Sequence, residues 1–198
     1  MDEREKCGWC RDGDILEAYH DAEWGAPVHD DRKHFEFLLM ESMQCGLNWL
    51  MMLKKRAVFA KCFADFDIAR VAAFGEDDVS HILAEPGMIR SAPKIRAVIG
   101  NARCFLRIAE EFGSFDRYLW GFTEGKMRVY RAHRLEGAPA RNELSDAISK
   151  DLKRRGFQYM GSITVYSHLQ ACGMINDHDP VCFRCEEIMR EQPVQWME

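Results

Sequence analysis

Two short clusters of cysteine and histidine lie at opposite ends of this 198-residue chain, and they constrain its fold more than any other feature. The clusters consist of Cys7, Cys10 and His20 near the N-terminus and of His178, Cys182 and Cys185 near the C-terminus. Thiolate and imidazole are the usual ligands of a structural zinc ion, which takes four of them. If both clusters bind one metal ion, the two ends of the chain must meet.

The spacing leaves several interpretations open. Cys7/Cys10 and Cys182/Cys185 are both Cys-x-x-Cys pairs, so a site of four cysteines is also conceivable. His178 and Cys182 would share one face if their segment were helical. Without a metal, the cysteines would be small buried hydrophobes and the histidines structural or solvated side chains.

Composition favours one compact domain spanning residues 1–198. Hydrophobic residues make up 47% of the chain, and no apolar run approaches the roughly 20 residues that cross a bilayer. Eight cysteines and a charged N-terminus without a signal-peptide core favour reduced thiols or metal ligands over disulfides. We therefore expect a cytoplasmic protein with no membrane association. The net charge of −5 means that any binding to nucleic acid must use local basic patches.

Apolar spacing predicts an all-α fold. The expected helices cover residues 32–43, 47–63, 67–74, 77–83, 93–111, 146–155 and 163–172. Ser91 is a candidate cap for the helix that begins at Pro93, and Ser145 for the helix that follows it. Residues 122–142 are polar and lack a clear period, which predicts a loop.

A turn over residues 85–93 joins two of the expected helices and is followed by basic residues, among them Lys94 and Arg96. A helix-hairpin-helix of this kind presents free backbone N–H groups and a helix N-terminus to a phosphate, as in a DNA clamp. The alternative is an ordinary pair of helices with basic residues on a solvated face.

A carboxylate lies in apolar surroundings within the first quarter of the chain. Glu41 follows Phe37 and Leu38 by one helical turn, and Trp49 begins the next helix beyond the break at Gly46. A glutamate beside an aromatic ring at the mouth of a pocket is one interpretation. A boundary residue of its helix is the other.

Taken together, the motifs resemble the 3-methyladenine DNA glycosylase I family, within the helix-hairpin-helix superfamily of base-excision repair enzymes. They follow the family's order along almost the whole chain. The matching motifs are Cys7-Gly-Trp9, Tyr19-His20-Asp21-x-Glu23-Trp24-Gly25, Glu41 with Gly46-Leu47-x-Trp49, Leu53-Lys-Lys-Arg56, Ile89-Arg90, Lys94-Ile95, Ile99-Gly100-Asn101-Ala102, Lys153-Arg-x-Gly156-Phe157, Gln170-Ala-Cys-Gly173 and Asn176-Asp177-His178.

The resemblance implies a single glycosylase domain with a helix-hairpin-helix at about 77–111 and zinc-binding ends at 7–20 and 178–182. It also implies which side chains bind the metal, and it leaves Cys10 and Cys185 out of the site. The implied ligands are Cys7, His20, His178 and Cys182, which would bind one structural zinc ion.

The implied activity is hydrolysis of the N-glycosidic bond of 3-methyladenine in double-stranded alkylated DNA, after the nucleotide has been flipped out of the helix. Glu41 would accept hydrogen bonds from the cationic base, Trp49 would stack on it, and Tyr19 would close the pocket. Lys94 and Arg96 would contact phosphate, and Leu47 would fill the gap left by the flipped nucleotide. No obligate protein partner is implied.

Some positions depart from the family pattern, namely Leu16, Asn48 and the hairpin sequence Ser91-Ala92-Pro93. They leave two alternatives to the 3-methyladenine glycosylase. One is an enzyme of the same fold with shifted specificity for alkylated bases, and the other is a non-catalytic, zinc-stabilised protein that binds damaged DNA. Retention of Glu41, Tyr19 and Trp49 together argues against a protein that only binds.

Overall fold

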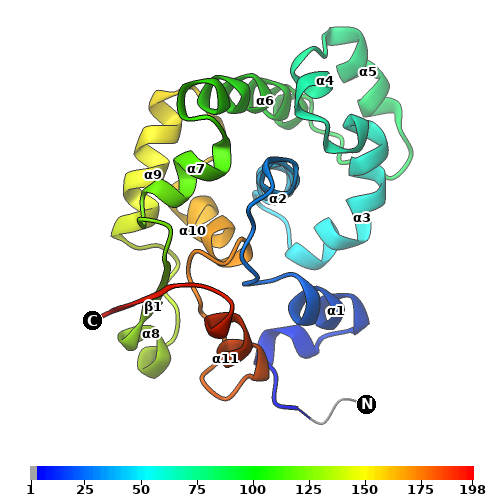
Figure 1. The fold of residues 1–198 in the computed structure, drawn as a ribbon. Helices are drawn as coiled ribbons and strands as arrows, with labels where there is room; N and C mark the ends of the chain where they lie inside the picture. Colours follow the sequence, from blue (N-terminus) through cyan, green and yellow to red (C-terminus); the bar gives the residue numbers. More distant parts are fainter. Residues whose placement is uncertain (1–3) are drawn as a thin grey trace.

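Eleven α-helices form most of the chain over residues 4–198, which are the residues described by the structure, a computed structural model. The other helices surround α2 (Asp31–Gln44), which lies at the centre of the molecule in Figure 1. They are α1 (Asp14–Ala22), α3 (Trp49–Cys62), α4 (Ile68–Ala72), α5 (Glu76–Ala84), α6 (Ala92–Phe112), α7 (Phe115–Gly121), α8 (Arg131–Glu136), α9 (Glu143–Arg154), α10 (Ser162–Ala171) and α11 (Phe183–Arg190).

Helix α2 is central because it is buried on every side. All residues from His34 to Met43 are buried, and a helix of this kind belongs inside a fold rather than on its surface. The Asp30 side chain caps its first turn by accepting a hydrogen bond from the Lys33 N–H, at 2.8 Å. Helices α3, α6, α7 and α10 pack around it. The central helix therefore presents Glu41 to the interior.

Most of the expected helices are confirmed, with ends that differ by two residues or fewer. The exception is α9, which begins three residues earlier than expected. Asn142 is its N-cap, and Ser145 is the third helical residue, whose hydroxyl accepts a hydrogen bond from the Asn142 N–H in a capping box. Ser91 occupies the N-cap position of α6, but its side chain makes no capping hydrogen bond. Helices α1, α7 and α11 were not predicted.

The prediction of a loop at residues 122–142 is wrong, and so the fold is mostly rather than entirely helical. This segment contains α8 and strand β1 (Met127–Tyr130), which pairs in parallel with β2 (Val194–Met197). The two strands are more than 60 residues apart in sequence. Their hydrogen bonds are non-local, and four-residue strands carry too little periodicity to be recognised locally.

The N-terminal segment lies beside α11 at one edge of the fold, whereas the last residues run away from it to β2 (Figure 1). The Phe183 N–H donates to the Glu5 carbonyl at 2.9 Å, and the Gly8 N–H donates to the Asp179 carboxylate at 3.2 Å. Gly173, at φ +76°, lies so close to Gly25 that a Cβ atom there would be 2.6 Å from the Gly25 carbonyl oxygen. The end of α10 is thereby held against the segment that follows α1.

None of the described helices combines the length and apolar character needed to cross a bilayer.

Candidate functional site

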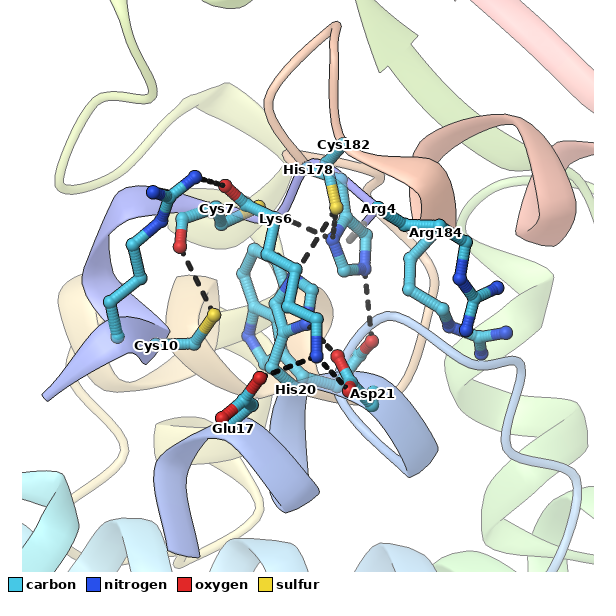
Figure 2. A network of polar contacts seen from close by, with 12 residues as sticks. Arg4, Lys6, Cys7, Cys10, Glu17, His20, Asp21, His178, Cys182 and Arg184 are labelled. Atoms are coloured by element: carbon cyan, nitrogen blue, oxygen red, sulfur yellow. Dashed lines mark hydrogen bonds and ion pairs between the residues drawn. The ribbon is translucent and has the colours of Figure 1, made fainter. Parts of the chain in front are cut away.

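The side chains of Cys7, His20, His178 and Cys182 converge at the meeting point of the two chain ends. Their four ligand atoms lie within 4.8 Å of one another, and all four residues are buried. The Nδ1 atom of His178 is 3.4 Å from Cys7 Sγ and 3.6 Å from Cys182 Sγ, and Cys182 Sγ is 3.4 Å from His20 Nε2 (Figure 2). Tetrahedral zinc with ordinary bond lengths separates sulfur and nitrogen ligands by roughly 3.6 Å. The geometry therefore fits one tetrahedral zinc ion.

Both imidazoles are oriented by acceptors on their far nitrogens. His20 Nδ1 lies 2.8 Å from the Asp21 carboxylate, which Lys6 also contacts at 2.5 Å (Figure 2). His178 Nε2 lies 3.1 Å from the Trp24 carbonyl. An outer acceptor that fixes the tautomer and ring orientation is the usual accompaniment of a metal-bound histidine.

Burial keeps both rings neutral, as a metal ligand must be. It lowers the pKa of His178 to about 3 and lowers the pKa of His20 from its ordinary value. Gly25 permits the approach of His178, because a Cβ atom at this position, where φ is +80°, would be 2.7 Å from His178 Nε2.

Cys10 and Cys185 are buried outside this cluster and have other partners. The Cys10 thiol donates to the Cys7 carbonyl at 3.0 Å, and Cys185 Sγ accepts from the Arg134 guanidinium at 3.3 Å. The segment from His178 to Cys182 is not helical, since Cys182 is the N-cap of α11. A loop rather than a helix face therefore brings these two side chains together.

A cavity of about 390 Å³ lies beside the cluster of Cys7, His20, His178 and Cys182. Residues from both chain ends, from the α2–α3 region, from the α8–α9 loop and from α10 line it: Trp9, Tyr19, Trp24, Glu41, Gln44, Trp49, Ala138, Ser167, Gln170, Ala171, Asp177 and Asp179. Four aromatic rings and three carboxyl groups therefore face one space, without a lysine, arginine or histidine among the lining residues. Such a pocket suits a flat ligand with positive charge.

Glu41 is a buried acid of this pocket, with 3% of its surface exposed. Burial raises its pKa to about 8. Among the described residues, no side chain donates a hydrogen bond to its carboxyl group. Its hydrogen-bonding capacity is therefore available to a ligand, and a cation would favour its ionised form.

Tyr19 and Trp49 also present unused polar atoms to the pocket. The Tyr19 hydroxyl and the Trp49 indole N–H are buried and have no hydrogen-bond partner in residues 4–198. Their ring centroids are 5.6 Å apart at an interplanar angle of 50°. Buried polar groups without partners are rare in folded proteins. They mark a place where a ligand would supply the missing contacts.

Helix α1, which carries Tyr19 and His20, is tied to the core by ion pairs. Both guanidinium NH₂ groups of Arg56 donate to the Glu23 carboxylate, at 2.6 and 2.7 Å, and Lys33 donates to it at 2.7 Å. Burial disfavours a charged Glu23, but these hydrogen bonds outweigh it and lower its pKa to about 2. The wall of the pocket is thus held by a half-buried charge network.

The structure places Leu16 and Asn48 outside the lining of the cavity. Leu16 is buried in the hydrophobic core, and neither residue lines the pocket. Asn48 is the N-cap of α3, where its side-chain oxygen accepts from the Met51 N–H at 2.8 Å. These departures therefore provide no structural support for a shifted substrate specificity.

The sequence-based assignment of Lys94 to a phosphate contact is revised. Its ammonium group points inward and donates to the Met43 and Cys45 carbonyls, at 2.8 and 2.6 Å, at the end of α2.

Arg96 is exposed and paired with Glu76 at 2.6 Å. Leu47 is 37% exposed between α2 and α3, and its role as a wedge stays a prediction. Arg90, in the hairpin turn, is exposed and forms no ion pair with any residue in 4–198.

Exchanging Lys94 for methionine is expected to lower the free energy of unfolding by about 1.5–3 kcal/mol, because charge-assisted hydrogen bonds to the end of α2 are lost. The salt dependence of DNA binding should hardly change. Arg90→Gln should do the opposite, with unchanged stability and a salt slope reduced by about one. Urea unfolding and DNA titrations at several salt concentrations measure both. A reduced slope in Lys94→Met with unaltered stability would restore Lys94 as the phosphate contact.

Several pocket residues were not predicted from the sequence. In the sequence, Trp9 and Trp24 lie close to Cys7 and His20, and Asp177 immediately precedes His178, so the cysteine and histidine clusters could have pointed to all three. The Asp177 carboxylate accepts from Tyr166 at 2.6 Å and from Gln170 at 2.8 Å. Gln44, Ala138 and Ser167 carry no comparable sequence signal.

Comparison with known proteins gives concordant relatives. A model of the methyladenine glycosylase family matches residues 9–185. DNA-3-methyladenine glycosylase 1 of Escherichia coli is 42% identical over 178 residues, which are 90% of this chain and 95% of that protein. A crystal structure of 3-methyladenine DNA glycosylase I superposes with a TM-score of 0.85 at 42% identity and covers 90% of this chain and 98% of its own. A variant of such a glycosylase in complex with 3-methyladenine superposes with a TM-score of 0.86 at 30% identity, with 90% and 96% covered.

Proposed function

The chain belongs to the methyladenine glycosylase family, and we propose that its aromatic pocket binds 3-methyladenine flipped out of double-stranded DNA while the bond between base and sugar is hydrolysed. The observation that carries this proposal is the pocket lining, which joins aromatic rings with carboxyl groups and contains no cationic side chain. Adenine methylated at N3 is flat and positively charged within DNA. It therefore matches both properties of the pocket.

The charge on the lesion base also simplifies the chemistry. A cationic base is already a good leaving group, so the enzyme needs recognition more than acid catalysis. Trp49 stacks on the base, Tyr19 bounds the pocket next to His20, and Glu41 accepts hydrogen bonds from the adenine edge. An ionised Glu41 favours the cationic lesion over neutral adenine, which is what repair requires.

The same proposal includes a zinc ion held by Cys7, His20, His178 and Cys182. With four protein ligands, its contribution is structural rather than catalytic. It would hold the N-terminal segment and α1 against the C-terminal segment. Because His20 directly follows Tyr19, the position of the pocket wall depends on this site.

DNA binding in this proposal uses the hairpin between α5 and α6, with Arg90 and Arg96 toward the phosphates and Leu47 toward the gap in the helix. A cytoplasmic location belongs to the same proposal.

A base-release assay tests the activity. The protein is incubated with alkylated double-stranded DNA, and the released bases are identified by chromatography. Release of 3-methyladenine is the expected result, and binding to the DNA without release of any base would contradict it.

Trp49→Ala is expected to weaken the binding of free 3-methyladenine roughly 5- to 150-fold, because stacking of a base on an aromatic ring contributes about 1–3 kcal/mol. Calorimetry measures the affinity. Trp196→Ala is the matched control, since Trp196 is exposed on β2 and does not line the pocket, and it should leave the affinity unchanged. Equal affinities in wild type and Trp49→Ala would remove Trp49 from the recognition site.

A further inference from the structure

A second group of metal-ligating side chains lies in the hydrophobic interior, apart from the proposed zinc site. His34 of α2 faces His168 of α10, and Cys172 is the C-cap of α10. One ligand atom from each of the three residues lies within 4.8 Å of the others. Their exposed fractions are 0%, 1% and 0%, and the Phe115 ring centroid is 5.8 Å from that of His34. None of the three lines the base-binding pocket.

The pattern within α10 suits metal binding. His168 and Cys172 are four residues apart at the end of the helix, so both side chains project from one face toward α2. His34 Nδ1 and His168 Nε2 are 3.4 Å apart. This is long for an N–H···N hydrogen bond, yet it matches the roughly 3.3–3.4 Å that separates two imidazole nitrogens bound to one tetrahedral zinc ion.

The outer nitrogen of His34 faces a carboxylate. His34 Nε2 lies 3.5 Å from Asp116 Oδ1, which in turn accepts from His29 Nδ1 at 2.9 Å. A carboxylate behind an imidazole fixes its tautomer and directs the other nitrogen to the metal. The side chains of Asp116 and His29 are 20% and 58% exposed, so this row of polar groups also leads from the surface to the cluster.

The cluster is poorly satisfied by protein contacts alone. His168 Nδ1 is buried without a hydrogen-bond partner in the described part of the chain, and His34 Nε2 has only the Asp116 carboxylate, at 3.5 Å. At most one hydrogen bond joins the two facing nitrogens. The Cys172 thiol has one long contact, to the Leu169 carbonyl at 3.7 Å. A cation would bind both facing imidazole lone pairs and the sulfur, which are satisfied only by these long contacts.

We propose that His34, His168 and Cys172 form a second metal site, which takes one late transition-metal ion of the zinc type. The donor set of two imidazoles and one thiolate selects such ions over magnesium or calcium. On binding, the Cys172 thiol loses its proton to solvent and both histidines bind as neutral rings. The site joins α2, which carries Glu41, to α10, which carries Gln170, so it would brace two walls of the pocket from behind.

Metal analysis of the full-length chain, purified with added zinc, tests the proposal. Wild type should contain about two zinc ions per chain, and the double variant His34→Leu/His168→Phe about one. This variant should still fold, because apolar rings and chains replace buried polar groups, and circular dichroism checks that it does. Cys172→Ser, which changes only the ligand atom, should also reduce the zinc content. His81→Gln, on the exposed face of α5, is the matched control and should retain both ions.

The outcomes separate this proposal from the zinc ion at the chain ends. Suppose that wild type contains about one zinc ion, which persists in the folded double variant and is lost in Cys7→Ser. This result would overturn the second site. If instead the one zinc ion of wild type persists in Cys7→Ser and is lost in the double variant, the result would support the second site and overturn the first. Neither result depends on glycosylase activity.

Discussion

Replacing Cys7 with serine is expected to release the zinc ion at the chain ends and to destabilise the whole domain. Structural zinc contributes about 10–16 kcal/mol of binding free energy in small zinc-dependent folds, which is comparable to the entire stability of most domains. The core around α2 remains in this variant, so a partial loss is the reasonable expectation. A loss of about 4 kcal/mol would lower the melting temperature by about 8–16 °C. Metal analysis and thermal unfolding measure the two effects together, and chelation of wild type should reproduce the shift.

Cys10→Ser and Cys185→Ser are the matched controls, since each removes a buried thiol from the same region. A serine at position 10 retains a donor for the Cys7 carbonyl, and neither sulfur belongs to the four-residue cluster. Both variants should retain the zinc ion and melt close to wild type. Loss of zinc in these two variants, with retention in Cys7→Ser, would replace the mixed ligand set by another.

Local patterns in the sequence were sufficient for most helices that build the core, but not for α7, whose Phe115, Leu119 and Trp120 are buried there. The buried helix α2, the break at Gly46 and the long helix α6 follow from apolar spacing, glycine and proline, all of which act within a few residues. The two chain ends were predicted to meet because a single metal ion would need ligands from both of them. Strands β1 and β2 carry no such marker, and so their pairing was missed.

The pocket was predictable only where a motif touched it. Glu41, Tyr19 and Trp49 were identified in advance, whereas Ser167 and Ala138 reach the same cavity from distant segments that have no local signal of function. Lys94 is the reverse case, because the sequence pattern assigned it a contact with DNA and the structure turns its side chain inward. A lysine after a hairpin turn has the sequence pattern of a phosphate contact, but the direction of its side chain is decided by the free carbonyls at the end of α2.

Glu41→Gln is expected to change how stability depends on pH. The pKa of Glu41 is raised from 4.5 to about 8 by burial, so the folded protein holds this proton more tightly than the unfolded chain does. Between these two values the folded state binds more protons, and stability therefore falls as pH rises, by up to about 1.4 kcal/mol per pH unit. Glutamine does not titrate, so the variant should lose this part of the slope and be more stable than wild type at pH 8. Urea unfolding from pH 5 to pH 8 measures it, with Glu186→Gln on the exposed face of α11 as control.

The same substitution should strongly reduce recognition of the charged base. Near neutral pH, a cationic base that enters the pocket draws Glu41 into its ionised form, and a proton is released. In Glu41→Gln the cation would be buried without its counter-charge, which costs about 3–5 kcal/mol and weakens binding roughly 150- to 5,000-fold. Neutral adenine loses only a hydrogen-bond acceptor and should bind within about tenfold of its wild-type affinity. Calorimetry in buffers of different ionisation enthalpy gives the affinities and the number of protons released. Equal weakening for both bases, or no proton release in wild type, would make Glu41 a boundary residue of α2 rather than the source of discrimination.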